Sequence, residues 1–224
     1  MDINKDKIKH HYHAVRLYEL IVEKLTQLGL DLKSIQRSDL APVDEFHVRG
    51  AAVSRELGNS LSLTGKSVLD VGCGLGGPCR MLADEFNCHA TGIDLSEEYV
   101  RTACELSKLV KLENKTSFVQ GDATNLPFEN ESFDVVWTQH VQMNIAEKQQ
   151  FYAEIERVLK KGGHFLYYDI FKSSNASINY PMPWASDESL SFLFESEQMN
   201  EILDALGFIH QKTTNQTQLG LAFI

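Results

Sequence analysis

From Lys66 onward, short apolar segments alternate with longer amphipathic ones, and this alternation constrains the fold more than any other feature of the chain. The apolar segments predict strands, and the amphipathic segments between them predict helices. Strands joined through helices run parallel in one sheet whose faces the helices cover. We therefore expect an α/β fold with a doubly wound, mostly parallel sheet. The expected strands are Ser67–Val71, Ala90–Asp94, Ser117–Gln120, Asp134–Thr138, His164–Ile170 and Phe208–Thr213, and the expected helices are Pro78–Phe86, Glu97–Leu112, Glu147–Leu159 and Glu197–Leu206.

The first 65 residues have a different pattern, and we expect residues 1–65 to form a helical cap or lid over a sheet domain at 66–224. Apolar residues recur at helical spacing over His13–Leu30, and Asp44–Leu57 predicts a second helix. The segment 171–194 interrupts the later alternation, is rich in Ser and Asn, and contains Tyr180 and Trp184 around two prolines. We interpret it as an insertion in the sheet domain.

Composition limits the class of protein. The 224 residues are 43% hydrophobic and 23% charged, which is typical of a globular chain and unlike a disordered one. The net charge of −10 argues against nucleic acid as a partner and suits a cationic or neutral ligand, although it also serves solubility. No apolar run approaches the roughly 18 residues of a membrane span, and Met1–Lys9 has no apolar signal core, so we expect a cytoplasmic protein.

No metal site is expected. The histidines at 10, 11 and 13 are too nearly consecutive to share one face of a helix, and the cysteine spacing matches no zinc site. The cysteines, which we expect to be reduced and mostly buried, are Cys73, Cys79, Cys88 and Cys104.

The segment 68–77, Val-Leu-Asp-Val-Gly-Cys-Gly-Leu-Gly-Gly, predicts a strand, a glycine-rich turn and the start of a helix. Glycine lets the backbone turn tightly and lets a ligand approach the main chain. Glycines at 72, 74 and 77 match the dinucleotide fingerprint, in which a pyrophosphate sits on the helix N-terminus. Glycines at 72, 74 and 76 follow Asp70, whose carboxylate would repel a pyrophosphate and would suit an ammonium group. The second interpretation is favoured, and the first stays open.

Polar residues also follow the next three expected strands. Asp94 could accept hydrogen bonds from both hydroxyls of a ribose; alternatively it caps the next helix, although Ser96 is available for that role. Asp122 could accept a hydrogen bond from an exocyclic adenine amine, or could form a turn with Gly121. His140 lies just beyond the C-terminal end of the fourth expected strand. Because ligands bind beyond the carboxyl ends of the strands in open α/β sheets, we expect these side chains in one site.

In their order and spacing, these stretches resemble the class I S-adenosylmethionine-dependent methyltransferases, over about residues 66–208. The resemblance implies a Rossmann-like fold, transfer of a methyl group from S-adenosyl-L-methionine, and S-adenosyl-L-homocysteine as the product. It also implies an N-terminal lid in which Tyr12 or Tyr18 folds onto the cofactor. The cofactor-binding residues that it implies are Tyr12, Asp70, Gly72, Cys73, Gly74, Gly76, Asp94, Leu95, Gly121, Asp122, Ala123 and Gln139.

A narrower resemblance concerns the acceptor. The segments 74–78, 139–144 and 180–184 are similar to a small-molecule branch that includes the glycine, sarcosine and dimethylglycine N-methyltransferases, near the ubiquinone/menaquinone and phosphoethanolamine methyltransferases. This implies an amine acceptor such as sarcosine or dimethylglycine, with a quinone, lipid or phosphoethanolamine-type acceptor as the alternative. Two other hypotheses are a nicotinamide dehydrogenase, which Asp70 disfavours, and a non-catalytic cofactor-binding regulatory module.

Methyl transfer from a sulfonium is an in-line displacement, for which the enzyme supplies mainly proximity and alignment. His140 is the expected catalytic residue, either as a general base or as a group that orients or binds the acceptor. The expected acceptor-binding residues are Gln142, Met143 and Asn144, with Tyr180 and Trp184 from the insertion as an aromatic wall for a cationic amine.

The C-terminal edge of the sheet is the weakest part of the resemblance. The family's sheet ends in a reversed seventh strand, which here would have to come from Leu219–Ile224 through a tight hairpin. Otherwise the seventh strand is missing, and the sheet edge stays open, is covered by another chain or pairs with one, as in a homo-oligomer.

Overall fold

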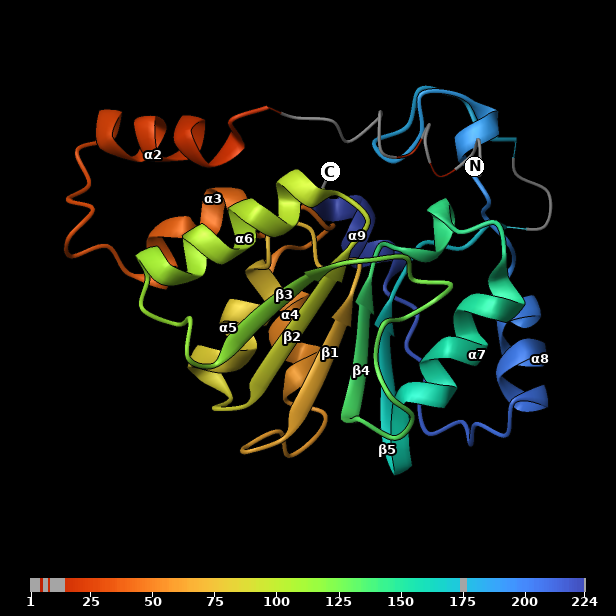
Figure 1. The fold of residues 1–224 in the computed structure, drawn as a ribbon. Helices are drawn as coiled ribbons and strands as arrows, with labels where there is room; N and C mark the ends of the chain where they lie inside the picture. The colour runs from red at the N-terminus through yellow and green to blue at the C-terminus, as the bar shows by residue number, and fades with distance from the viewer. Residues whose placement is uncertain (1–4, 6–7, 9–14, 174–176, 224) are drawn as a thin grey trace.

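The computed structural model describes residues 5, 8, 15–173 and 177–223. Its centre is a five-stranded parallel sheet in the order β3-β2-β1-β4-β5 (Figure 1). The order reverses between β1 and β4, which makes the carboxyl ends of these two strands the switch point where ligands bind in such sheets. The doubly wound α/β prediction is confirmed. The strands are β1 (Ser67–Val71), β2 (His89–Asp94), β3 (Thr116–Gln120), β4 (Phe133–Gln139) and β5 (Leu159–Tyr168).

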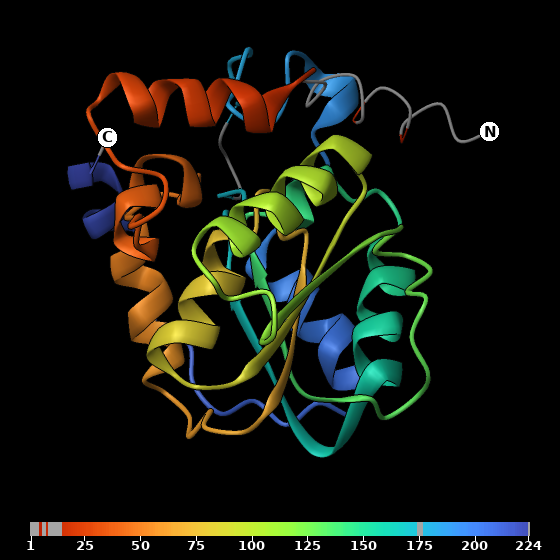
Figure 2. The same cartoon turned by 60° about the vertical axis from the view of Figure 1, so that its left-hand side comes forward.

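Helices cover both faces of the sheet, because both faces of its central strands are apolar (Figure 2). On one face, Val68 and Trp137 pack with Cys79 and Met81 of α5. On the other, Leu69 and Val136 join a second core with residues of α7 and α8. None of the helices in the described part of the chain is long and apolar enough to cross a membrane. The helices of this domain are α5 (Gly77–Glu85), α6 (Glu97–Leu109), α7 (Lys148–Val158) and α8 (Ser196–Ala205).

The N-terminal region is helical, with one interruption that the sequence pattern did not predict. Helix α2 (Leu17–Gln27) packs against α6 and lies at the carboxyl end of the sheet in both views (Figures 1 and 2). The single helix expected over Asp44–Leu57 is wrong: α3 (Ala41–Asp44) follows the short turn η1 (Arg37–Leu40), and α4 (Ala51–Gly58) begins only after a non-helical segment. The break has a cause, since buried Arg80 binds the Asp44 carboxylate and holds the end of α3 against α5.

The C-terminal expectations also need correction. Residues 208–213 form no strand, and Ile209 is 81% exposed. Residues Thr217–Phe223 form helix α9, so the hairpin strand expected at Leu219–Ile224 is wrong over its described residues. An apolar alternation becomes a strand only if it reaches a free sheet edge and buries one face. Among the described residues, β5 therefore has no strand partner on its outer edge.

Candidate functional site

A cavity of about 790 Å³ lies at the carboxyl end of the sheet. Three chain segments besides the strand ends close it: the break between α3 and α4, the turn η2 (Gln142–Asn144) after β4, and the insertion around Met182–Trp184. The residues expected in a site that line this cavity are Asp70, Gly72, Cys73, Gly74, Asp94, Leu95, Gly121, Asp122, Ala123, Gln139, His140, Met143, Asn144 and Trp184. The structure therefore brings most of the expected residues together.

Four expected residues are not among those lining the cavity. Gly76 forms the N-cap of α5, and Gln142 lies buried beneath its turn, where its amide donates to the carbonyl oxygen of Ile170. Tyr180 is half-buried and packs behind Trp184. Tyr12 lies outside the described residues, and Tyr18 packs toward α6 instead of lining the cavity.

The glycine-rich turn serves two different purposes. Gly74 has φ of +53°, and a Cβ built there would meet nothing within 4 Å, so this part of the backbone faces open space. A Cβ on Gly77, by contrast, would lie 1.9 Å from the carbonyl oxygen of Asp44. The third glycine of the dinucleotide spacing is therefore needed for packing the N-terminal region onto α5.

Asp70 is a buried carboxylate that no cation balances among the described residues. Its side chain is 2% exposed and accepts one hydrogen bond, from the thiol of Cys79 at 3.5 Å. Burial raises the pKa of Asp70 to about 7, and the negative charges of Asp94 and Glu45 add to this effect. A cationic group entering the cavity would relieve the cost of ionising Asp70, so the site is suited to an ammonium ligand.

Asp94 braces the glycine-rich turn. One carboxylate oxygen accepts from the backbone N–H of Gly74 and the other from that of Ser96, each at 2.9 Å. Ser96 caps α6 through a hydrogen bond from the N–H of Tyr99. Burial raises the pKa of Asp94 even though hydrogen bonds from the backbone N–H groups of Ser96, Gly74 and Leu95 oppose it. A carboxylate has about four lone-pair sites, which leaves acceptor capacity for a hydroxyl group in the cavity.

Asp122 makes hydrogen bonds within a turn, which was the alternative to a role in binding adenine, and it also contacts Lys5. Oδ1 accepts from the backbone N–H and the hydroxyl of Thr124, both at 2.8 Å. Oδ2 lies 2.7 Å from Nζ of Lys5. Burial opposes ionisation, but these hydrogen bonds outweigh it and lower the pKa of Asp122. No sequence signal pointed to the contact with Lys5, because it joins residues far apart in the chain.

A hydrogen-bonded chain links the N-terminal region to the end of β4. His47 Nε2 lies 3.1 Å from the carbonyl oxygen of Gly50 and 3.0 Å from Oγ of Ser54. Because a carbonyl only accepts, this nitrogen must carry the proton. Ser54 in turn donates to Oε1 of Gln139 at 3.2 Å, and Trp137 Nε1 donates to the same oxygen at 2.9 Å.

His140 is held in an unusual backbone conformation at the cavity wall. Its φ is +54°, in the left-handed region that non-glycine residues seldom adopt outside turns and functional sites. The imidazole stacks on Tyr168 with ring centroids 5.2 Å apart, and the ring of His47 lies 6.0 Å away. Burial, and secondarily His47, lowers the pKa of His140 to about 4, so the ring is neutral near pH 7.

The other side of the cavity is apolar. Met143 and Trp184 are almost fully buried, and Asn144 ties the insertion to η2 by donating to the carbonyl oxygens of Trp184 (2.9 Å) and Leu190 (3.2 Å). Phe46 and Val48 of the lining belong to the region 1–65 that was expected to form a cap. No signal in the sequence singled out other apolar lining residues, which include Ile145, Ile170, Met182 and Phe192.

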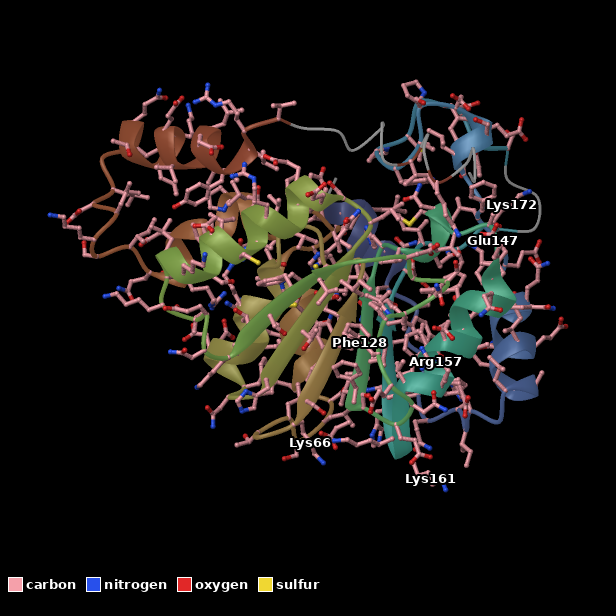
Figure 3. The ribbon with its side chains drawn as sticks, in the orientation of Figure 1. Lys66, Phe128, Glu147, Arg157, Lys161 and Lys172 are labelled. Atoms are coloured by element: carbon pink, nitrogen blue, oxygen red, sulfur yellow. The ribbon has the colours of Figure 1, made fainter. Side chains whose placement is uncertain are left out.

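Glu147 and Lys172 both lie toward the carboxyl end of the sheet, and Lys66 and Lys161 lie at the opposite end (Figure 3). Of the described residues that line the cavity, Lys5 is the only lysine or arginine. The structure shows no group of three or more metal-ligating side chains within its described ranges.

Comparisons with known proteins agree with this geometry. A methyltransferase domain model matches residues 69–167. A sterol 24-C-methyltransferase of Gibberella zeae is 40% identical over 105 residues, covering 47% of this chain and 28% of the relative. A phthiotriol/phenolphthiotriol dimycocerosates methyltransferase of Mycobacterium leprae is 32% identical over 187 residues, covering 83% and 64%. The chain thus spans less than two thirds of either relative.

Solved structures show the same fold. A phosphoethanolamine N-methyltransferase of Haemonchus contortus superposes with a TM-score of 0.71 at 24% identity, covering 81% of this chain and 43% of that one. The [4+2]-cyclase SpnF superposes with a TM-score of 0.60 at 27% identity, covering 70% and 57%. The matched domain contains the glycine-rich turn, Asp94, Asp122 and the end of β4. Residues 69–167 thus match a methyltransferase domain, in agreement with the resemblance to the class I S-adenosylmethionine-dependent methyltransferases.

Proposed function

We propose that the protein transfers a methyl group from S-adenosyl-L-methionine to a small-molecule acceptor. The observation that carries this proposal is the buried carboxylate of Asp70 beside the open backbone at Gly74, in a cavity that Asp94 and Asp122 also line. The cofactor presents an ammonium group, ribose hydroxyls and an adenine amine, all hydrogen-bond donors. A carboxylate that can accept hydrogen bonds lies at the carboxyl end of each of the first three strands. The residues present therefore fit the cofactor.

When bound, the cofactor supplies a methyl group activated on a sulfonium. Asp70 would hold the ammonium group, Asp94 the ribose hydroxyls, and Asp122 the adenine amine. Leu95 and Ala123 would flank the base. Because Lys5 already holds one oxygen of Asp122, the adenine amine would share that carboxylate with Lys5.

His140 would act on the acceptor. Its neutral ring can accept a hydrogen bond, so it can orient a hydroxyl or amine and take the proton that leaves it. The cover formed by residues 46–48 and the insertion would exclude water from the transfer. Holding the two reactants in line can contribute roughly 7–11 kcal/mol to lowering the barrier. We propose that residues 1–65 serve as this cap.

Within this function, an uncharged apolar acceptor of the quinone or lipid kind fits better than sarcosine or dimethylglycine. An acceptor that carries a carboxylate or a phosphate would need hydrogen-bond donors or a cation of its own in the acceptor half of the cavity, in addition to those that the cofactor uses. The one described lysine of the lining is engaged by Asp122, and the lining histidines His47 and His140 have their pKa lowered by burial to about 4. The sterol and phthiotriol methyltransferases among the relatives are named for apolar acceptors.

Two measurements test the proposal. Calorimetry should detect S-adenosylhomocysteine binding with a micromolar or tighter Kd. Turnover to S-adenosylhomocysteine should then be seen with a prenylated quinol or a sterol and be absent with sarcosine, dimethylglycine and phosphoethanolamine. Binding without turnover on any acceptor would favour the regulatory module, and turnover with sarcosine alone would reverse the acceptor assignment.

A further inference from the structure

The break between α3 and α4 places a second histidine beside His140. His47 lines the same cavity, and the centroids of the two imidazole rings lie 6.0 Å apart with the ring planes at 77°. One ring comes from the N-terminal region and the other from the residue after β4. An acceptor group that reaches His140 therefore lies close to His47 as well.

The two nitrogens of the His47 ring have different surroundings. Three oxygens lie around Nε2: the carbonyl of Gly50 at 3.1 Å, Oγ of Ser54 at 3.0 Å and Oε2 of Glu45 at 3.3 Å. In the neutral ring the proton is on Nε2, because the Gly50 carbonyl can only accept, so Nδ1 carries the lone pair. Within the described part of the chain Nδ1 makes no hydrogen bond, yet the protein does not enclose it. Since His47 lines the cavity, this lone pair is open to a ligand there.

Glu45 provides a carboxylate next to the ring. Its Oε2 is buried and accepts no hydrogen bond from the described residues, although Nε2 of His47 is only 3.3 Å away. Burial, and secondarily the charge of Asp44, raises the pKa of Glu45 to about 7. The charges of Arg37 and Arg55 oppose this rise. A positive charge on His47 would favour the ionised form of Glu45, and the carboxylate would in turn stabilise that charge.

His140 has no such support. Among the described residues its ring makes no hydrogen bond, and its ring neighbours are Tyr168 and His47. Burial, and secondarily His47, lowers the pKa of His140, whereas the hydrogen bond to Gly50 opposes the effect of burial on the pKa of His47. Two rings this close will not both accept a proton, because the two positive charges would repel each other. The ring that faces a carboxylate is therefore the better base.

We propose that His47 is the general base of the methyl transfer, that Glu45 is the positioning residue that stabilises its imidazolium, and that His140 orients the acceptor. This inference rests on the proposed function for the reaction. With a hydroxyl acceptor, the oxygen bonds to the methyl carbon while the carbon–sulfur bond breaks and leaves its electron pair on sulfur. The hydroxyl proton passes to Nδ1 of His47. The imidazolium, held through Nε2 by Gly50, Ser54 and Glu45, afterwards releases this proton to water.

Turnover with two acceptors tests the assignment: a prenylated quinol, and a ring-halogenated analogue whose hydroxyl is already ionised at the assay pH. His47→Gln keeps an N–H for Gly50 and Ser54 but has no basic nitrogen. It should lower kcat with the quinol by about 100-fold or more, the contribution of a general base, and by less than about tenfold with the ionised analogue, from which no proton has to leave. Glu45→Gln should lower kcat at least about tenfold with the quinol and less than about threefold with the analogue.

His89→Gln is the matched control, because it makes the same change at an exposed histidine at the start of β2, away from the cavity. It should leave kcat with both acceptors unchanged. All three variants should bind S-adenosylhomocysteine within about threefold of the unaltered protein in calorimetry. Equal losses with both acceptors in His47→Gln, or a loss below tenfold with the quinol, would overturn the inference. If the unaltered protein did not bind S-adenosylhomocysteine, the proposed function itself would fail, which is a separate result.

NMR spectroscopy of the unaltered protein gives a readout that depends neither on turnover nor on how the variants fold. Without ligand, long-range ¹H–¹⁵N spectra of the histidine rings should show His47 with a protonated Nε2 and an unprotonated Nδ1. With S-adenosylhomocysteine and the quinol both bound, the Nδ1 resonance should move toward its protonated position. With S-adenosylhomocysteine and the dimethyl ether of the quinol, which has no hydroxyl, it should not move. A protonated Nδ1 in the free protein, or the same shift with the ether, would contradict the assignment.

Discussion

Burial of Asp70 disfavours the negative charge that the proposed ligand requires. Its folded-state pKa of about 7 lies above the ordinary value of about 3.9. Between those two values the folded protein therefore holds a proton that the unfolded chain has lost. The contribution of Asp70 to the free energy of unfolding must fall as the pH rises through this window.

This gives a prediction for Asp70→Asn. The variant lacks the charge, so without ligand it should be more stable than the unaltered protein at pH 8, by at most about 4 kcal/mol, and the difference should shrink toward pH 4. Urea unfolding at both pH values measures it. The free energy of unfolding of the variant minus that of the unaltered protein should be larger at pH 8 than at pH 4. A smaller difference at pH 8 would show that burial does not raise the pKa of Asp70.

At the scale of elements, the buried pair of Arg80 and Asp44 joins the N-terminal region to the sheet domain. Arg80 is fully buried on α5, and it also donates to the carbonyl oxygens of Leu75 and Ala103. Arg80→Met would leave the Asp44 carboxylate buried without a partner, and the free energy of unfolding should fall by about 3–5 kcal/mol. Chemical denaturation checks this, and adding Asp44→Leu should restore part of the loss. A loss below 1 kcal/mol in the single variant would contradict the role of this pair.

The turn after β4 depends on Asp169. Its carboxylate accepts from the backbone N–H groups of Val141 (3.4 Å) and Gln142 (3.3 Å), directly after the left-handed residue His140. In Asp169→Ala the amide hydrogens of these two residues should exchange with solvent at least about tenfold faster, because the acceptor that protects them is gone. Hydrogen-exchange NMR measures the rates, and amides of β1 serve as the internal control. Unchanged exchange at 141 and 142 would rule out this role of Asp169.

The elements also show where sequence patterns succeed. Strands β1–β5 were predictable because each contains a short apolar run between turn signals. The residues expected to form a turn at 160–163 belong to β5 instead, where the pairing of β5 with β4 shifts register between Phe133 and Val135. The failures at 44–57, 208–213 and 219–223 share one cause. Whether those segments continue as helix or pair as strands depends on distant partners such as Arg80 or a neighbouring strand, and the local pattern does not contain that information.

At the scale of the whole molecule, the cofactor half of the cavity was more predictable than the acceptor half. Asp70, Asp94 and Asp122 sit at strand ends, and strand ends converge in any parallel sheet. The acceptor half combines residues from four separate segments, and only packing shows that Phe46 and Phe192 face the same space. The positions of Gln142 and Tyr180 behind the lining follow from the same packing.

Trp184 tests the acceptor half separately from the cofactor half. It is 6% exposed, and its indole donates to Ser191 within the insertion. Trp184→Ala should lower kcat/KM for an apolar acceptor by about tenfold or more, because a large apolar contact is lost, and should change the Kd of S-adenosylhomocysteine by less than about threefold. Equal effects on the acceptor and cofactor constants would mean that the insertion does not form a separate acceptor wall.

We propose that this cavity binds S-adenosylmethionine through the acidic residues at its strand ends, and that the glycine-rich turn does not bind a dinucleotide. Calorimetric titration of S-adenosylhomocysteine and of NAD, each into the unaltered protein and into Asp70→Asn, tests it most directly. We expect that S-adenosylhomocysteine binds, that NAD does not, and that Asp70→Asn weakens S-adenosylhomocysteine binding by about 100-fold or more. Binding of NAD, binding of neither ligand, or full S-adenosylhomocysteine affinity in Asp70→Asn would contradict it.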